Sequence, residues 1–301
     1  MKKETIGIIS VILVFALIIG VNMGDINITG DLISEKEITV LRMGLIPADD
    51  ADEMLRQYEP IQEYLSRELG MPVEIQVTSD YTAAIEAMKY NHIDLAWFGP
   101  FSYILASEIA DAEAIVNGVK SDGKSTYKSI IIANKDSGIQ TLEDLKGKSF
   151  AFVDPTSTSG NLIPRKMLIE NGIDPDNDFS EMFYAGTHNA VEYSIANGQV
   201  DAGASSDNVY TKMVNAGEID PQVNLIVYES EPIPGSPIAV RGSLSEEFKE
   251  AIKQALLNMD KQTINKVDGW GGIVSYQEVR DGDYDVIRQT AEILEMDLTQ
   301  N

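Results

Sequence analysis

Short apolar segments alternate with segments of helical spacing from residue 38 onwards, and this alternation limits the possible folds more than any other feature. Ile38–Gly44 and Val73–Val77 have the pattern of strands, and Asp52–Leu69 between them carries apolar side chains at helical spacing. Leu95–Phe98 reads as a further short, buried strand. Strands that alternate with helices usually pair in parallel and carry the helices on their faces. The sequence therefore predicts an α/β protein with mostly parallel sheets.

The alternation restarts in the middle of the chain, with a strand at Ser149–Val153 and a helix at Leu162–Asn171. We therefore predict two lobes, the first formed by residues 38–133 plus 232–301 and the second by residues 134–231. The sequence has no long linker between them. Short crossings of this kind are typical of hinged two-lobe receptors that close around a ligand.

The start of the chain has the pattern of an export signal. Lys2 and Lys3 precede an uncharged apolar run from Ile6 to Val21, which is also almost long enough to anchor the chain in a membrane. A buried core helix is the alternative, although the run is not amphipathic. We predict that residues 1–24 form a signal peptide or N-terminal membrane anchor and residues 25–37 a spacer. The rest of the chain is then extracytoplasmic.

Acidic residues outnumber basic ones by 48 to 23, which gives a formal net charge of -25. Nucleic acids and anionic membrane surfaces are bound through basic patches, so neither is expected as a partner of the folded part. An anionic ligand would have to be held by local hydrogen-bond donors and not by the overall charge. The sequence contains no cysteine, which removes disulfides, thiolate metal sites and a bacterial lipoprotein anchor.

Four hydroxyl-bearing residues, Thr156 to Ser159, follow the predicted strand Ser149–Val153 and precede a helix. Pro155 ends the strand because it has no N–H for the sheet. The first N–H groups of a helix lack intrahelical acceptors, and the helix dipole places a partial positive charge there. Together with the hydroxyls they suit a tetrahedral oxyanion with several acceptor oxygens. Helix capping alone is the alternative, but four hydroxyls at the carboxyl end of a strand are more than a cap requires.

Several segments, taken in order, resemble one protein family: Trp97–Pro100, Asp154–Gly160, Gly186–His188, Gln199–Ala202 and Pro232–Ile238. They are similar to segments of the phosphate, phosphite and phosphonate-binding proteins of ABC transporters, the periplasmic phosphonate-binding family. The resemblance spans about residues 38 to 262. It implies a two-lobe, periplasmic-binding-protein-like (type II) α/β fold with hinged lobes. It also implies a monomeric protein that binds a small phosphorus oxyanion and passes it to an ABC transporter permease.

The resemblance further implies which side chains hold the oxyanion: Tyr81, Tyr127, Ser157, Thr158, Ser159 and His188. The tyrosines lie beside predicted strands and can donate from their hydroxyls, although half-buried packing residues are the alternative. His188 begins a predicted helix, where it can donate to a ligand or serve only as a polar helix-start residue. His92, in a turn before a buried strand, is expected to be structural.

Asp207 is the seventh predicted site residue, because in the family an acid at this position can face the organic end of an aminophosphonate. The alternative is a helix cap. A second acid of some family members is replaced here by Ser236, which puts recognition of a ligand ammonium group in doubt. The sequence therefore favours phosphate, phosphite or a simple alkylphosphonate.

An enzyme built on Ser157 or Ser159, His188 and Asp207 is one competing hypothesis. The sequence has no Gly-x-Ser-x-Gly motif, metal-binding cluster or dinucleotide loop, so neither catalysis nor a cofactor or metal is expected. A receptor for a carboxylate or a sulfur oxyanion, or a sensory receptor, remains an alternative.

Overall fold

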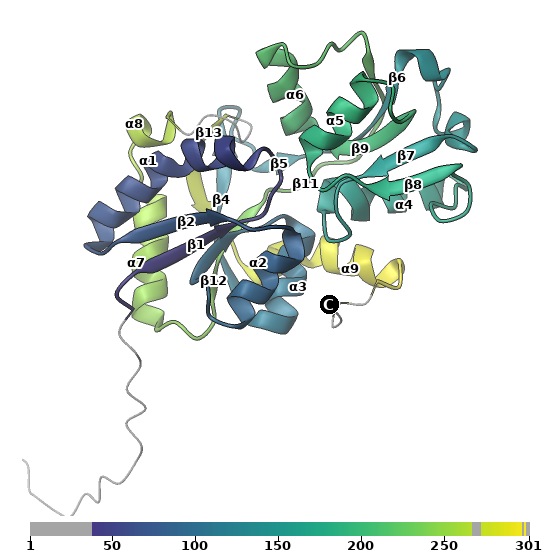
Figure 1. The fold of residues 1–301 in the computed structure, drawn as a ribbon. Helices are drawn as coiled ribbons and strands as arrows, with labels where there is room; N and C mark the ends of the chain where they lie inside the picture. Colours follow the sequence, from purple (N-terminus) through teal and green to yellow (C-terminus); the bar gives the residue numbers. More distant parts are fainter. Residues whose placement is uncertain (1–37, 267–271, 297, 299–301) are drawn as a thin grey trace, which may run out of the picture. The chain divides into compact units, whose positions relative to one another are not determined.

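The computed structural model describes residues 38–266, 272–296 and 298, and these contain two β-sheets flanked by helices (Figure 1). The predicted export or anchor segment and the spacer lie outside the described residues. Within the part of the chain that is described, no helix has both the length and the apolar character needed to cross a bilayer.

The first lobe is built on a six-stranded sheet with α1, α7 and α8 on one face and α2, α3 and α9 on the other (Figure 1). In spatial order its strands are β13 (Ile273–Glu278), β4 (Ala112–Lys120), β12 (Pro237–Arg241), β3 (Leu95–Trp97), β1 (Leu41–Leu45) and β2 (Val73–Val77). Its helices are α1 (Ala51–Leu69), α2 (Tyr81–Lys89), α3 (Pro100–Ala110), α7 (Glu246–Leu257), α8 (Lys261–Ile264) and α9 (Asp285–Ile293).

The second lobe is built on a five-stranded sheet. Its strands, in spatial order, are β10 (Asn224–Glu229), β6 (Ser129–Asn134), β9 (Ala202–Ser206), β7 (Ser149–Phe152) and β8 (Glu181–Tyr184). Its helices are α4 (Ile163–Glu170), α5 (His188–Ala196) and α6 (Asp207–Ala216), with a π-helical turn, η3 (Thr158–Leu162), before α4. Single 3-10 turns occur at η1 (Lys135–Ser137) and η2 (Leu142–Leu145), and in the first lobe at η4 (Asp281–Tyr284).

Both sheets are mixed, where the sequence predicted mostly parallel ones. β1 pairs in parallel with β2 and β3, and β7 with β8 and β9, as helical crossovers require. The remaining pairs are antiparallel. They involve strands next to the crossings between the lobes, such as β6 and β12, which enter their sheets without a preceding helical crossover.

The two crossings between the lobes pair with each other. β5 (Thr126–Tyr127) and β11 (Ile233–Pro234) form a two-stranded antiparallel ribbon. The outgoing crossing ends earlier than the sequence suggested, because β6 hydrogen-bonds to β9 and β10 of the five-stranded sheet. Strand β6 lies within the residues predicted for the first lobe, but it belongs to the sheet of the second lobe. Such a narrow ribbon is the element about which the lobes can hinge.

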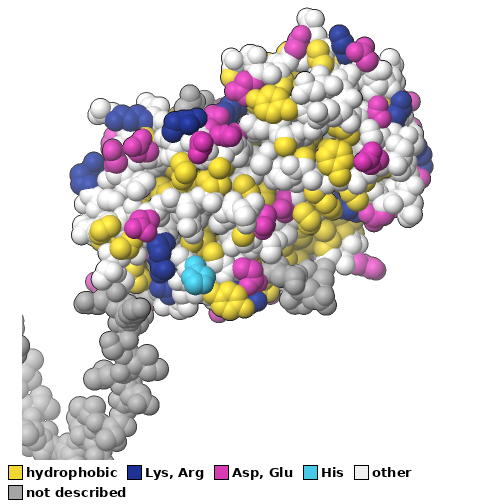
Figure 2. Space-filling model, viewed as in Figure 1, with side chains coloured by type: hydrophobic (Ala, Val, Ile, Leu, Met, Phe, Trp, Pro, Cys, Tyr) yellow, Lys and Arg dark blue, Asp and Glu magenta, His cyan; other side chains and the backbone are white. Residues whose placement is uncertain are grey.

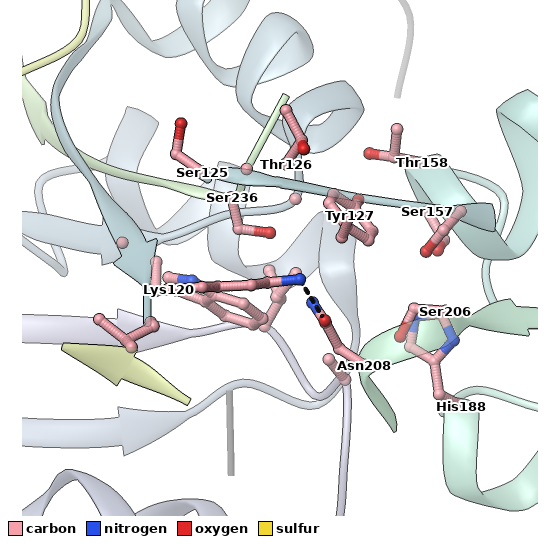
Figure 3. Close-up of a pocket in the computed structure, with 18 of the residues that line it drawn as sticks. Lys120, Ser125, Thr126, Tyr127, Ser157, Thr158, His188, Ser206, Asn208 and Ser236 are labelled. Carbon is pink, nitrogen blue, oxygen red and sulfur yellow. Dashed lines mark hydrogen bonds between the residues drawn. The ribbon is translucent and has the colours of Figure 1, made fainter. Parts of the chain in front are cut away.

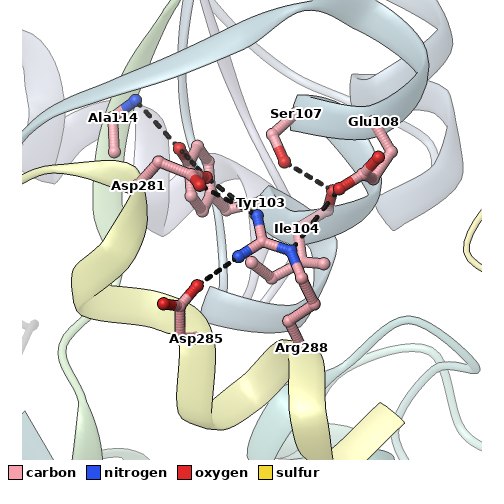
Figure 4. A network of polar contacts seen from close by, with 8 residues as sticks. All are labelled: Tyr103, Ile104, Ser107, Glu108, Ala114, Asp281, Asp285 and Arg288. Carbon is pink, nitrogen blue, oxygen red and sulfur yellow. Dashed lines mark hydrogen bonds and ion pairs between the residues drawn. The ribbon is translucent and has the colours of Figure 1, made fainter. Parts of the chain in front are cut away.

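Helix α9 is fastened to the first lobe by a polar network around Arg288 (Figure 4). The guanidinium contacts Asp281 and Asp285, and it reaches Glu108 on α3 at 3.4 Å. Tyr103 of α3 donates to Asp281 and accepts the N–H of Ala114 on β4. The network therefore holds the end of the described chain against α3.

Charged side chains of both signs are scattered over the face of the molecule in Figure 2 and form no single basic patch there. His92 is exposed after α2, where its backbone N–H donates to the Ala87 carbonyl, and it is not among the residues that line the cavity between the lobes. Its structural role stays a prediction.

Candidate functional site

A cavity of about 70 Å³ lies between the two lobes (Figure 3). Second-lobe residues on its wall include the hydroxyl-bearing Ser157, Thr158 and Ser159, together with His188. First-lobe residues on its wall include Tyr81, Tyr127, Trp97, Lys120 and Ser236. Six of the seven predicted site residues therefore line one cavity, and the strands and helices that carry them come from both lobes.

The loop after β7 is followed by a helical turn, as the sequence predicted, but this turn is π-helical. Ser157 is the N-cap of η3, and its Oγ accepts the N–H of Gly160 at 3.1 Å. The turn is π-helical because the Leu162 N–H reaches back to the Ser157 carbonyl. Among the residues that the structure describes, the N–H groups of Thr158 and Ser159 have no acceptor, as expected in the first turn of a helix. The loop therefore offers backbone donors as well as hydroxyls.

Thr158 also joins the two lobes. Its Oγ1 accepts the N–H of Phe101 at 2.8 Å, in the first turn of α3. Gly99, the N-cap of α3, has no side chain of its own to satisfy that N–H. A hydroxyl can accept and donate at once, so Thr158 keeps a donor for the cavity while it caps a helix of the other lobe. The capping alternative and the ligand-cradle hypothesis are thus compatible in the same loop.

Tyr81 and Tyr127 are buried at the cavity wall, at the start of α2 and on β5. Burial raises the pKa of both phenols well above the usual value, although hydrogen bonding to Ser157 for Tyr81 and to Ser159 for Tyr127 partly opposes this. Both side chains are therefore neutral near pH 7. A neutral phenol can donate its O–H to an anion.

His188 begins α5, is 5% exposed and lines the cavity. Burial lowers its pKa to about 4, against the opposite effect of Asp49, so the imidazole is neutral at physiological pH. Its Nδ1 lies 3.3 Å from the Ser205 hydroxyl, and its backbone N–H donates to Ala48 of the first lobe. A neutral imidazole provides one donor and one acceptor, so His188 contributes a hydrogen bond and not a charge.

Asp207 is not part of the cavity wall. It begins α6, and its Oδ1 accepts the N–H of Lys128 at 2.9 Å, which ties the helix to the end of the crossing. Its neighbours Ser206 and Asn208 line the cavity instead. Ser206, and not Asp207, is the N-cap of α6, so the helix-cap alternative does not hold for Asp207 either. A binding role for Asp207 rests on the family resemblance alone.

Several lining residues were not predicted, above all Lys120 and Asn208, with Tyr58 and Tyr276 beside them. Lys120 closes β4 and lies next to a polar turn, which gives no sign of a site. Tyr58 has helical spacing and was assigned to the core, and β13, which carries Tyr276, was not predicted. Lys120 and Asn208 are 88 positions apart, so the contact between them leaves no local pattern in the sequence.

Among the described residues that line it, the site holds neutral donors and the ammonium group of Lys120. Within the described residues, no three His, Cys, Asp or Glu side chains are grouped to hold a metal ion. Two mixed α/β lobes, a paired crossing and a donor-lined cavity between them are the architecture of a two-lobe solute-binding protein of the type II class.

Comparison with known proteins identifies the family. Residues 43–284 match the family described as "ABC transporter, phosphonate, periplasmic substrate-binding protein", and the chain belongs to it. The chain is 30% identical to the phosphate-import protein PhnD of Mycolicibacterium smegmatis, over 84% of this chain and 85% of that one. It is also 30% identical to the phosphonates-binding periplasmic protein of Escherichia coli, over 76% of this chain and 68% of that one.

A solved structure agrees with this assignment. The binding protein component of an ABC phosphonate transporter from Pseudomonas aeruginosa superposes with a TM-score of 0.79 at 27% identity, and the match covers 85% of this chain and 86% of that one. The predicted two-lobe type II fold is confirmed. Because the family consists of transporter binding proteins, the prediction that the chain is not an enzyme is confirmed as well.

Proposed function

We propose that this chain binds a small phosphorus oxyanion, a phosphonate, phosphite or phosphate, between its two lobes and delivers it to the permease of an ABC importer. The observation that carries the proposal is the buried turn Ser157–Ser159, which lines the cavity and in which the N–H groups of Thr158 and Ser159 have no acceptor among the described residues. The relatives named as phosphate and phosphonate-binding proteins support the same ligand class.

We assign the anionic head group to donors from both lobes. Ser157, Thr158 and Ser159 supply hydroxyls, Thr158 and Ser159 also supply backbone N–H groups, and Tyr81, Tyr127 and His188 supply neutral donors around them. In a chain of net charge -25, short hydrogen bonds are what overcomes the long-range repulsion of an anion. Several hydrogen-bond donors that surround the head group from both lobes suit the oxygens of a tetrahedral anion.

The size of the cavity restricts what is attached to the head group. A water molecule needs roughly 10–15 Å³ of such space, so about 70 Å³ admits a ligand of only a few heavy atoms. Inorganic oxyanions and short phosphonates meet this limit.

The remaining parts of the assignment concern the chain outside the site. We propose that the protein acts as a monomer, that residues 1–24 serve as its export signal or membrane anchor, and that Asp207 positions α6 through Lys128. The membrane is then contacted only through the N-terminal segment.

The double variant Ser157→Ala/Thr158→Ala tests the assignment. We expect it to lose measurable binding of phosphate, phosphite and methylphosphonate in calorimetry, because it removes two hydroxyl donors and the cap that shapes the turn. Ser180→Ala, an exposed serine of the same lobe, is the control and should bind as the wild type does.

Unfolding curves of both variants must show that the lobes remain folded. The assignment is contradicted if the wild-type protein binds none of these ligands but binds a dicarboxylate or a sulfonate.

A further inference from the structure

Lys120 stands out among the residues of the cavity because it carries a formal positive charge. It is the last residue of β4, and its backbone is fixed by hydrogen bonds to the turn that follows, with Lys124 and Gly123. Figure 3 shows its side chain reaching from the first lobe across the cavity, on the side away from Ser157 and His188. The ammonium group is therefore placed to meet the part of a ligand that points away from the hydroxyl turn.

Asn208 fixes the position of this ammonium group. Lys120 Nζ donates to Asn208 Oδ1 at 2.8 Å, and the two residues belong to different lobes. The neutral amide orients the lysine and leaves its charge intact, whereas a carboxylate at this position would cancel it. Lys120 thus keeps a charge and two further N–H donors for a ligand.

The acidic groups nearest to the cavity are already engaged elsewhere. Asp154 accepts from the N–H and hydroxyl of Thr156, Asp207 accepts from Lys128, and Asp49 pairs with Lys212. Within the described residues, the wall of the cavity includes neither Asp nor Glu. A cationic substituent on the ligand would therefore have no carboxylate of the wall in direct contact.

We propose that Lys120 determines the charge of the ligand's substituent: the site accepts phosphonates whose substituent is neutral or anionic and rejects those that carry an ammonium group. This inference rests on the proposed function, and it specifies the ligand class of the same site. An anionic substituent such as a carboxylate gains a charge-assisted hydrogen bond from Lys120. An ammonium group meets the like charge of Lys120, which disfavours its binding.

Calorimetry with three phosphonates tests the proposal: methylphosphonate, with a neutral substituent, phosphonoacetate, with an anionic one, and 2-aminoethylphosphonate, with a cationic one. The wild-type protein should bind phosphonoacetate at least about tenfold more tightly than 2-aminoethylphosphonate. Lys120→Met keeps the length of the side chain and removes the charge. The affinity for phosphonoacetate should fall by about tenfold in this variant, and the affinity for methylphosphonate should change by less than about threefold.

Two further variants make the result specific. Asn208→Asp places a carboxylate beside the ammonium group and should shift the preference in the same direction as Lys120→Met, without removing the lysine. Lys124→Met removes an equal charge from the neighbouring turn, where the side chain is 71% exposed and lines no part of the cavity. This control should bind all three ligands as the wild type does.

The outcomes separate this inference from the proposed function. If the wild type binds methylphosphonate but binds 2-aminoethylphosphonate as tightly as phosphonoacetate, the role of Lys120 is overturned and the proposed function stands. Equal weakening of all three ligands in Lys120→Met also overturns it, because the lysine then contacts the head group. If the wild type binds no phosphorus oxyanion, both are overturned.

Discussion

Glu192 lies behind the ligand cavity as a fully buried carboxyl group on α5, one turn from His188. The side-chain amide of Asn224 donates to its Oε2 at 3.0 Å, while Oε1 has no partner among the residues that the structure describes. Burial raises the pKa of Glu192 to about 7, and the hydrogen bond from Asn224 only partly opposes the shift. This carboxyl group therefore titrates near neutrality, well above the range of an exposed one.

We predict that Glu192→Gln stabilises the protein above pH 7. Between pH 4.5 and 7 the folded state binds a proton that the unfolded state has lost, so the free energy of unfolding falls as the pH rises across this window, by about 3 kcal/mol in total. The glutamine cannot ionise and escapes this loss. Urea unfolding at pH 5, 6, 7 and 8 should show a difference between the two proteins that grows with pH.

His188 gives the opposite slope and is present in both proteins. Its lowered pKa means that the unfolded state binds more protons between pH 4 and 6.5, so its contribution to stability is lost as the pH falls through this range. Glu74→Gln, on the exposed side of β2, serves as the control. A pH-independent difference between Glu192→Gln and the wild type would contradict the prediction.

At the residue level, the residues assigned to the anionic head group could be predicted from the sequence, but those at the other end of the site could not. Ser157, Thr158, Ser159 and His188 could be predicted because each lies at the start of a helix that follows a strand, and the carboxyl ends of strands meet at one edge of a sheet. Lys120 and Asn208 could not, since they come together only when two lobes meet. Asp207 was named from the family resemblance, and the sequence could not show that its neighbours Ser206 and Asn208 line the cavity instead.

The π-helical turn η3 is the element on which the site depends most directly. Gly160 lies within it, and a Cβ atom there would come 2.3 Å from Cγ2 of Val153 and 2.9 Å from the Ser157 hydroxyl. Such contacts are too short, so any larger residue would displace the turn from β7. The presence of glycine here is required by this close approach.

We predict that Gly160→Ala destabilises the protein by about 1–3 kcal/mol and abolishes anion binding, because the added methyl group displaces Ser157 and its neighbours. Chemical denaturation and calorimetry measure the two effects. Gly282→Ala is the matched control, since its Cβ atom would meet only the far end of Asp285 at 3.9 Å. Unchanged binding in Gly160→Ala would show that the shape of the turn does not matter.

The elements that were not predicted from the sequence are those whose apolar residues do not recur with a simple helical or strand period. Helix α3 is buried from Pro100 to Ala106, so it has no polar face to mark it as amphipathic. The helix at Ile163–Glu170 was predicted, but the π-helical turn before it was not, because that turn depends on the close packing of Gly160 against β7. Helices with one exposed face, such as α1 and α5, were predicted to within a residue or two at each end.

The closed arrangement of the whole molecule is held by contacts far from the hinge. Lys212 of α6 pairs with Asp49 at 2.5 Å and with Glu53 of α1 at 2.6 Å, which joins the second lobe to the first. The contacts from Phe101 to Thr158 and from His188 to Ala48 also join the lobes, closer to the cavity. The contacts that join the two lobes therefore lie both beside the cavity and farther from it.

We predict that Lys212→Met shifts the lobes toward an open form and weakens every ligand by the same factor, about three- to tenfold. A receptor that is closed for a smaller fraction of the time loses apparent affinity in proportion, whatever the ligand. Small-angle scattering without ligand should show a larger radius of gyration, and calorimetry the uniform loss. Lys166→Met, which breaks an ion pair within α4, is the control. Losses that differ between ligands would contradict the prediction.

The pairing of β5 with β11 places the two ends of the second lobe side by side. Residues between these strands form one continuous stretch that leaves and re-enters the first lobe at a single point, so the stretch can be exchanged between homologous genes as one cassette. Its exchange would transfer the hydroxyl turn and His188 while leaving Lys120 in place. The hydroxyl turn, His188 and Asn208 would in this way be inherited separately from Tyr81, Tyr127 and Lys120 on the facing wall of the cavity.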